Sequence, residues 1–240
     1  MSQLLSIEPA TGDRLWEGTA SDVDAEVGRA RGAWPKWAAM ALTDRMELIR
    51  RFSNVARDAE DELADLIARE TGKPVWEART EVAAIVGKVD ISIKAYAERT
   101  SQRRVEGSGA RNALRHKPHG VMAVLGPYNF PAHLPNGHIV PALIAGNTVI
   151  FKPSEKTPAT AEFLVKCFHA AKVPEDVIQL LIGGPEEGKA LVGHWLVDGV
   201  LFTGSAHAGI AINRKLATEP GKIVALEMGG NNPIVMLDTP

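Results

Sequence analysis

The stretch VMAVLGPYNFPAHLPNGHIVPALIAGNTVIFKPSE, residues 121–155, decides the fold. It holds two short apolar runs, Val121–Leu125 and Thr148–Phe151, and each run is followed by glycine, proline or polar residues. The segment between the runs is long enough for a crossover helix. Because parallel strands cannot be joined by a tight turn, this pattern predicts two parallel strands connected by a helix.

The same pattern continues to the end of the chain. We expect further strands at four apolar runs, which are Val177–Ile182, Gly199–Phe202, Ile223–Leu226 and Ile234–Leu237. Short strands that alternate with helical segments predict an α/β fold, with a Rossmann-like, mainly parallel sheet and helices on both of its faces. Such sheets bind ligands at the carboxyl ends of their strands, so the informative residues should follow the apolar runs.

The first hundred or so residues read as mainly helical. One apolar stripe runs from Val75 to Tyr96 at helical spacing, and the helix before it should end at Thr71-Gly72. Residues 101–117 are polar and rich in arginine, with a turn flanked by extended pieces around Gly107-Ser108-Gly109. We therefore divide the chain into an N-terminal helical part, residues 1–110, and a Rossmann-like nucleotide-binding domain, residues 111–240.

Composition excludes several classes of protein. The 240 residues are 45% hydrophobic and 23% charged, which is ordinary for a folded protein and argues against disorder. A net charge of −2 without a long basic run gives no support to a nucleic-acid partner. No apolar stretch has membrane-spanning length and no signal segment opens the chain, so we expect a cytoplasmic protein without a membrane partner.

The single cysteine, Cys167, rules out a disulfide within the chain and fits a reducing compartment. It lies in an amphipathic helical pattern, so we expect a core thiol rather than a nucleophile. The seven histidines do not predict a metal site, because no His-Glu-x-x-His motif occurs and His133 and His138 stand on either side of a Pro-Asn-Gly turn.

The loop Gly126–Pro131 holds the first candidate for chemistry. Its two prolines, Pro127 and Pro131, fix the backbone on either side of Asn129. A rigid loop can aim an amide N–H donor at an oxyanion. The alternative is a turn asparagine that bonds its own backbone.

Three polar residues follow the Thr148–Phe151 run. Lys152 supplies donors, Glu155 supplies acceptors, and Ser154 can cap a helix that starts there. A glutamate beside a ribose accepts from both hydroxyl groups and repels a 2′-phosphate, which favours NAD over NADP. The alternative is a capped helix start with a surface ion pair.

The segment Gly183–Ala190 nearly matches the phosphate-loop pattern G-x-x-x-x-G-K-[ST]. We reject that match because Ala190 stands where a hydroxyl must bind Mg²⁺, and because two glutamates would repel the phosphates. Gly184 and Gly188 fit a glycine turn near a cofactor better.

The segment Phe202–Gly209 also follows a strand. Gly204 permits a close backbone approach, and Ser205 can cap the next helix, whose free N–H groups would attract a pyrophosphate. The usual G-x-G-x-x-G fingerprint is missing, so a plain capped turn is the alternative.

Glu227 follows the Ile223–Leu226 run and precedes paired glycines. Burial there would favour its neutral form and suit it to act as a general base, whereas the alternative is a strand-end acid in contact with water. The paired glycines Gly229 and Gly230 leave room for a ligand or a moving ring beside it.

Taken together and in this order, the motifs resemble the aldehyde dehydrogenase superfamily. The resembling segments are Pro9–Gly12, Gly126–Pro131, Phe151–Glu155, Phe202–Ser205 and Leu226–Gly230. The segments His133–His138 and Gly229–Pro233 are most similar to the N-succinylglutamate 5-semialdehyde dehydrogenases of arginine catabolism.

The resemblance implies a role for each motif. Asn129 would donate to the oxyanion and Glu227 would activate the deacylating water. Lys152 and Glu155 would hold the adenosine ribose of NAD. The remaining residues expected to contact the cofactor are Pro127, Tyr128, Ser154, Gly184, Gly188, Phe202, Thr203, Gly204, Ser205, Gly209, Met228 and Gly229.

The sequence departs from the family pattern at its end. By resemblance, the nucleophilic cysteine comes some thirty residues after the glutamate, and this chain ends at Pro240. We therefore expect the catalytic cysteine domain to be absent and the 240 residues to be inactive alone. The parent enzyme would oxidise a small aldehyde with NAD and form a homo-oligomer. The alternative is a non-catalytic nucleotide-binding or interaction module.

Overall fold

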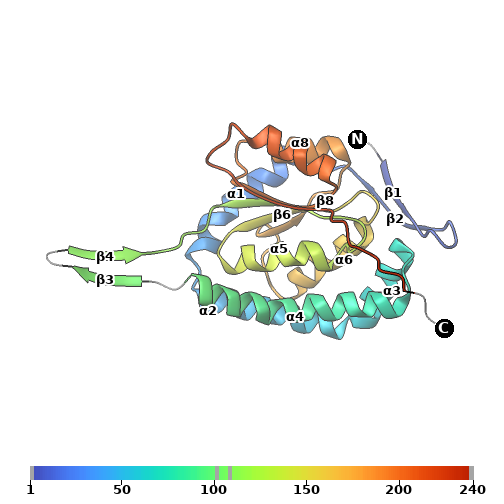
Figure 1. Ribbon diagram of the computed structural model, residues 1–240, viewed down its shortest axis with the longest axis horizontal. Helices are drawn as coiled ribbons and strands as arrows, with labels where there is room; N and C mark the ends of the chain where they lie inside the picture. The colour runs from blue at the N-terminus through green and yellow to red at the C-terminus, as the bar shows by residue number, and fades with distance from the viewer. Residues whose placement is uncertain (1–2, 101–102, 108–109, 238–240) are drawn as a thin grey trace.

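The computed structural model describes residues 3–100, 103–107 and 110–237, with the backbone alone for 103–107 and for 110 and 111. Two antiparallel hairpins and one larger sheet hold the strands (Figure 1). The hairpins are β1 (Gln3–Ile7) with β2 (Arg14–Thr19) and β3 (Arg103–Gly107) with β4 (Ala110–Leu114). The sheet contains β5 (Val121–Leu125), β6 (Thr148–Lys152), β7 (Ile178–Leu180), β8 (Gly199–Gly204) and β9 (Ile223–Met228).

The large sheet is parallel throughout and has the order β7-β6-β5-β8-β9. The chain winds outward in one direction from β5 to β7 and then returns to add β8 and β9 on the other side. The strand order therefore reverses between β5 and β8, where the loops leaving the two strands turn to opposite faces and open a crevice. The predicted Rossmann-like α/β fold is confirmed.

Helices cover both faces of the sheet (Figure 1). Their bounds are α1 (Val23–Ala39), α2 (Leu42–Asp58), α3 (Glu60–Thr71), α4 (Val75–Arg99), α5 (His133–Ile144), α6 (Pro158–Ala170), α7 (Pro185–Gly193) and α8 (Ala206–Leu216). Helices α2 to α6 pack on one face, whereas α7, α8 and the first part of α1 pack on the other, and Trp37 near the end of α1 joins the core of the first face. The sheet is thus the central layer of three.

Strand β5 shows why the inner strands of the sheet are mostly apolar on both faces. Met122 and Val124 point to the face covered by α2 to α6, and Val121 and Ala123 point to the opposite face. Successive side chains of a strand alternate between faces, and both faces here are buried, so no polar alternation can appear. The division of the chain at residue 110 stays a prediction.

The helical prediction for the first hundred residues is correct from residue 23 onward. Helix α3 ends as expected, with Gly72 in the left-handed region (φ +77°) and its N–H donating to Ala68 O. Before residue 20, however, the chain forms the β1–β2 hairpin around a turn at Gly12. The extended pieces flanking the turn predicted around Gly107-Ser108-Gly109 are β3 and β4, and Ser108-Gly109 lies outside the described residues.

The strand expected at Ile234–Leu237 is wrong. These residues are not part of the sheet, and each is at least 77% exposed. An apolar run becomes a strand only where a neighbouring strand offers hydrogen-bonding partners, and among the described residues none lies beside this run. Its apolar side chains are left facing solvent.

Candidate functional site

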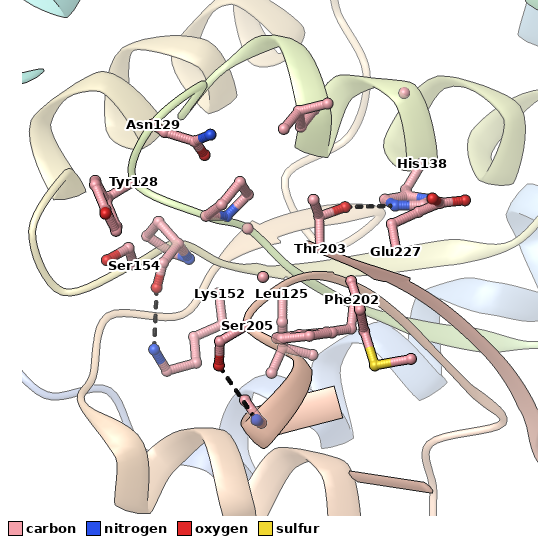
Figure 2. A pocket seen from close by; sticks show the side chains of 18 of the residues that line it. Leu125, Tyr128, Asn129, His138, Lys152, Ser154, Phe202, Thr203, Ser205 and Glu227 are labelled. Atoms are coloured by element: carbon pink, nitrogen blue, oxygen red, sulfur yellow. Dashed lines mark hydrogen bonds between the residues drawn. The ribbon is translucent and has the colours of Figure 1, made fainter. Parts of the chain in front are cut away.

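A cavity of about 950 Å³ lies at the carboxyl edge of the sheet, beside the β5–β8 switch. Its volume is at the upper end of the roughly 300–1,000 Å³ typical of ligand sites. Figure 2 shows Tyr128 and Asn129 on one side of it and Thr203, His138 and Glu227 on the other. The predicted site residues that line it are Pro127, Tyr128, Asn129, Lys152, Ser154, Glu155, Phe202, Thr203, Gly204, Ser205, Glu227, Met228 and Gly229.

The loop that carries Asn129 is anchored from helix α4. Lys73 Nζ donates to the backbone oxygen of Asn129 at 2.7 Å and to Glu81 Oε2 at 2.9 Å. The other oxygen of the fully buried Glu81 side chain accepts from the backbone N–H groups of Ala132 and His133, both at 3.0 Å. Among the described residues the Asn129 side chain has no hydrogen-bond partner, so its amide is free to serve a ligand.

Lys152 is a buried cation whose ammonium keeps N–H donors available for a ligand. It is only 6% exposed, and its ammonium donates to the neighbouring Pro153 O at 3.0 Å. Burial lowers the pKa of Lys152, and the charges of Glu155 and Glu187 partly oppose that shift. An ammonium has three donors, so two of them can meet hydroxyl or phosphate oxygens of a ligand in the cavity.

The helix cap expected at Ser154 is wrong. Helix α6 starts at Pro158, and Ser154 Oγ instead accepts from Lys156 N at 3.3 Å. Proline suits the first helical position because its missing N–H needs no partner there. The next two N–H groups, of Ala159 and Thr160, donate to the carboxylate of Glu70 from α3, at 2.9 and 2.7 Å.

A second cavity, of about 850 Å³, adjoins the first and shares Lys152 and Glu155 with it. Gly184 and Gly188 line this second cavity, not the first. A Cβ at Gly188 would lie 3.4 Å from Lys152 Cε, so the glycine leaves room for the lysine stem. The two glycines are thus close to the ribose-binding candidates, on the side of α7.

The turn after β8 has the predicted form. Ser205 Oγ accepts from Ala208 N at 3.2 Å and caps helix α8, whose N-terminus faces the cavity. Gly209, however, lines neither cavity. A Cβ there would lie 2.5 Å from Met228 Sδ, so this glycine allows α8 to pack closely against β9.

Glu227 is the last residue but one of strand β9 and is exposed at the cavity, so the burial expected for it is wrong. In Figure 2 its carboxylate lies next to the imidazole of His138. His138 also lies 3.1 Å from Thr203 Oγ1. Burial lowers the pKa of His138, the negative charge of Glu227 opposes this shift, and the positive charge of Lys88 adds to it.

Sequence reasoning missed the wall that α4 and α5 contribute. This wall consists of Lys88, Leu134, Gly137 and His138. The segment between His133 and His138 is helical, so the Pro-Asn-Gly turn expected there is wrong. The i, i+3, i+4 spacing of Leu134, Gly137 and His138 places them on one helix face, and that signal was available in the sequence.

Cys167 is a core thiol, as predicted. It lies on the buried face of α6, and burial raises its pKa to about 11, with the charge of Glu62 adding to that shift. A thiol in this state is protonated at neutral pH and is a poor nucleophile. The described residues contain no group of three metal-binding side chains, and none of their helices is both long and apolar enough to cross a bilayer.

Comparison with known proteins agrees with the fold and the motifs. Residues 2–239 match the model of the aldehyde dehydrogenase family. A protein from Novosphingobium aromaticivorans named N-succinylglutamate 5-semialdehyde dehydrogenase is 69% identical over 240 residues, which are 100% of this chain and 51% of that protein. The chain thus spans about half the length of the curated relatives it matches.

Comparison with solved structures agrees with this family match. An NAD-dependent benzaldehyde dehydrogenase from Corynebacterium glutamicum superposes with a TM-score of 0.89 at 28% identity, covering 96% of this chain and 52% of that one. A glyceraldehyde-3-phosphate dehydrogenase from Methanocaldococcus jannaschii, complexed with NADP, has the same TM-score at 27% identity, covering 96% and 51%. With the ordered motifs and the parallel sheet, these matches show that the chain belongs to the aldehyde dehydrogenase family.

Proposed function

We propose that the protein containing this chain oxidises an aldehyde to the carboxylic acid with NAD. The observation that carries the proposal is the convergence of Asn129, Lys152, Glu155 and Glu227 on one cavity at the switch point of the sheet. The ends of three strands, β5, β6 and β9, supply these residues, and strand ends at a switch point are where parallel sheets bind ligands.

The proposed roles follow from the donors and acceptors on the cavity wall. The free amide of Asn129 would donate to the oxygen of the aldehyde as it gains negative charge. The carboxylate of Glu227 would take a proton from the water that releases the product acid. The nucleophilic cysteine of this mechanism would come from the remainder of the protein, because the chemistry of Cys167 does not suit it.

The dinucleotide would lie across the adjoining wall. The spare donors of Lys152 and the carboxylate of Glu155 fit the hydroxyl groups of a ribose, and the Ser205-capped start of α8 fits a pyrophosphate. When bound, the nicotinamide would supply the oxidising power for the reaction. Related structures are linked to both NAD and NADP, and we favour NAD because Glu155 would repel a 2′-phosphate.

We propose N-succinylglutamate 5-semialdehyde as the substrate, and with it a role in arginine catabolism. The support is the name of relatives up to 69% identical and the similarity of His133–His138 to that subfamily. The wall that includes His138 lies in the same cavity as Asn129, so the subfamily motif is part of the site.

The test is turnover by the full-length protein. Purified protein should form NADH from the semialdehyde, and Asn129→Ala should lower kcat roughly 100- to 1,000-fold, as for other oxyanion donors. Asn54→Ala, at an exposed position on α2, is the matched control. Full activity of the Asn129 variant, or no NADH from the wild type, would reject the proposal.

The cofactor choice has its own readout. Removing the charge with Glu155→Gln should raise kcat/KM with NADP relative to NAD by roughly tenfold, because repulsion of the 2′-phosphate is lost. An unchanged ratio would contradict the assignment of Glu155 to the ribose without touching the proposed aldehyde chemistry.

A further inference from the structure

Lys88 occupies a position that the proposed function has not used. It lies on α4, half-buried, and lines the same cavity as Asn129 and Glu227. A Cβ at Gly137 would lie 3.7 Å from Lys88 Cε and 3.8 Å from its Nζ. The ammonium therefore rests over the face of α5 that forms the cavity wall, in the space left by the missing side chain at position 137.

The ammonium of Lys88 has no carboxylate partner among the described residues, whose ion pairs are all made by other cations. The nearest buried acid on α4, Glu81, is committed to Lys73 and to two backbone N–H groups. Burial lowers the pKa of both His133 and His138, and the charge of Lys88 adds to each shift. A half-buried cation thus lines the cavity, against the helix that carries both histidines.

The other lysine in the cavity wall cannot take this role. Lys152 lies at the end of β6, next to Glu155 and the second cavity, on the side assigned to the dinucleotide. Lys88 belongs to the wall that α4 and α5 form, which also holds Leu134, Gly137 and His138. The two lysines therefore divide the cavity into a cofactor side and an aldehyde side, each with one cation.

We propose that Lys88 selects aldehydes that carry a carboxylate remote from the reacting carbon, by binding that carboxylate. This inference rests on the proposed function and adds to it the group that recognises the substrate. An ammonium–carboxylate contact is a charge-assisted hydrogen bond, and it forms in a site where the cation has no competing partner. A neutral aldehyde of the same length would enter the cavity without forming this charge-assisted hydrogen bond to Lys88.

A rival role for Lys88 would be to tune Glu227 across the cavity. That role would affect water activation for every aldehyde alike, whereas recognition of a carboxylate affects only substrates that carry one. The two roles therefore predict different effects of a Lys88 substitution on kcat/KM for an aldehyde that carries a carboxylate and for one that does not.

The experiment compares two substrates on the full-length protein, N-succinylglutamate 5-semialdehyde and an uncharged straight-chain aldehyde. Lys88→Met keeps the length of the side chain and removes its charge. It should lower kcat/KM for the semialdehyde roughly 10- to 100-fold, mainly through KM, and leave kcat/KM for the neutral aldehyde within about twofold. Lys88→Arg should restore most of the loss. Lys94→Met, exposed on the same helix, is the matched control.

The outcomes separate this inference from the function it builds on. An equal loss with both aldehydes, or no loss with either, overturns the role of Lys88 while the semialdehyde activity of the wild type stands. A wild type that prefers another carboxylate-bearing aldehyde, and loses that preference in Lys88→Met, rejects the proposed substrate and supports the role of Lys88. A wild type that oxidises no aldehyde overturns both.

Discussion

The position and the pKa of the His138 side chain depend on the residues that surround it in the folded chain. Its imidazole is held between α5 and the end of β8 through Thr203 Oγ1, at 3.1 Å. Burial lowers its pKa below the ordinary value of 6.5. A histidine of this kind stays neutral at pH values where an exposed one takes up a proton, so it can hold Thr203 in place without adding positive charge next to Glu227.

This shift predicts how stability depends on pH. The unfolded chain binds a proton on His138 near pH 6.5, but the folded chain does so only at lower pH. The contribution to stability is therefore complete above pH 6.5 and is lost as the pH falls through the folded pKa. His138→Gln should flatten the fall in urea midpoint measured from about pH 8 down to about pH 5.

The exposed His207 provides the control for this measurement. His207→Gln removes a histidine whose side chain is exposed rather than buried. His133, whose pKa burial also lowers, should act in the same direction as His138. A pH profile for His138→Gln that superimposes on that of the wild type would contradict the prediction.

At the scale of elements, one buried ion pair joins the α3–α4 connection to the β5–α5 loop. Lys73 and Glu81 have side chains that are 9% and 0% exposed. Together they hold the backbone at Asn129, Ala132 and His133. The pair thus fixes the path of the loop that presents the Asn129 amide, although neither residue itself lines the cavity.

Removing one member of the pair should be costly. Lys73→Met leaves a buried carboxylate without its partner, which should destabilise the protein by about 3–5 kcal/mol. Misplacement of Asn129 should also lower kcat more than it raises KM. Urea unfolding and steady-state kinetics of the full-length protein measure the two effects.

Two further variants complete that test. Glu81→Gln in the Lys73→Met background removes the unpaired charge and should recover part of the stability. Arg51→Met breaks an exposed pair with Glu47 and should cost at most about 0.5 kcal/mol. Equal stability losses in Lys73→Met and Arg51→Met would show that the buried pair has no special role.

The elements differ in how far local sequence predicts them. The strands β5, β6 and β8 were predictable because their apolar runs are bounded by glycine, proline or polar residues and buried on both faces. The β1–β2 hairpin was missed because its strands lie at the surface, where only a weak alternation marks them. Ile234–Leu237 has the composition of a strand but no neighbour among the described residues, and pairing is not a local property.

At the scale of the whole molecule, seven of the exposed large apolar side chains belong to the edge strand β9 and the segment that follows it. Strand β9 is the edge strand of the sheet, and its residues Ile223, Val224 and Met228 are partly exposed. The segment Ile234–Leu237 follows it and is exposed to solvent. Solvent-facing apolar chain next to an unpaired strand edge promotes association. The homo-oligomer and the cytoplasmic location stay predictions.

A polypeptide of these 240 residues should therefore self-associate. Sedimentation velocity over a range of concentrations should show species larger than the monomer, and Val235→Glu with Leu237→Lys should shift them towards the monomer. Ile91→Glu changes an isolated exposed apolar residue on α4 and should have little effect. A wild-type chain that stays monomeric throughout would contradict this prediction.

The sequence alone identified the five segments that form the sheet, because a strand buried on both faces must be apolar and must end at residues that break it, but it also predicted a strand at Ile234–Leu237 that does not form. It also placed Asn129, Lys152 and Glu227 at strand ends. The tertiary structure decided the strand order, the capping of α6 by Glu70 and the entry of Lys88 and His138 into the cavity. These features join residues far apart in the chain, and such contacts depend on packing between elements, which no local pattern records.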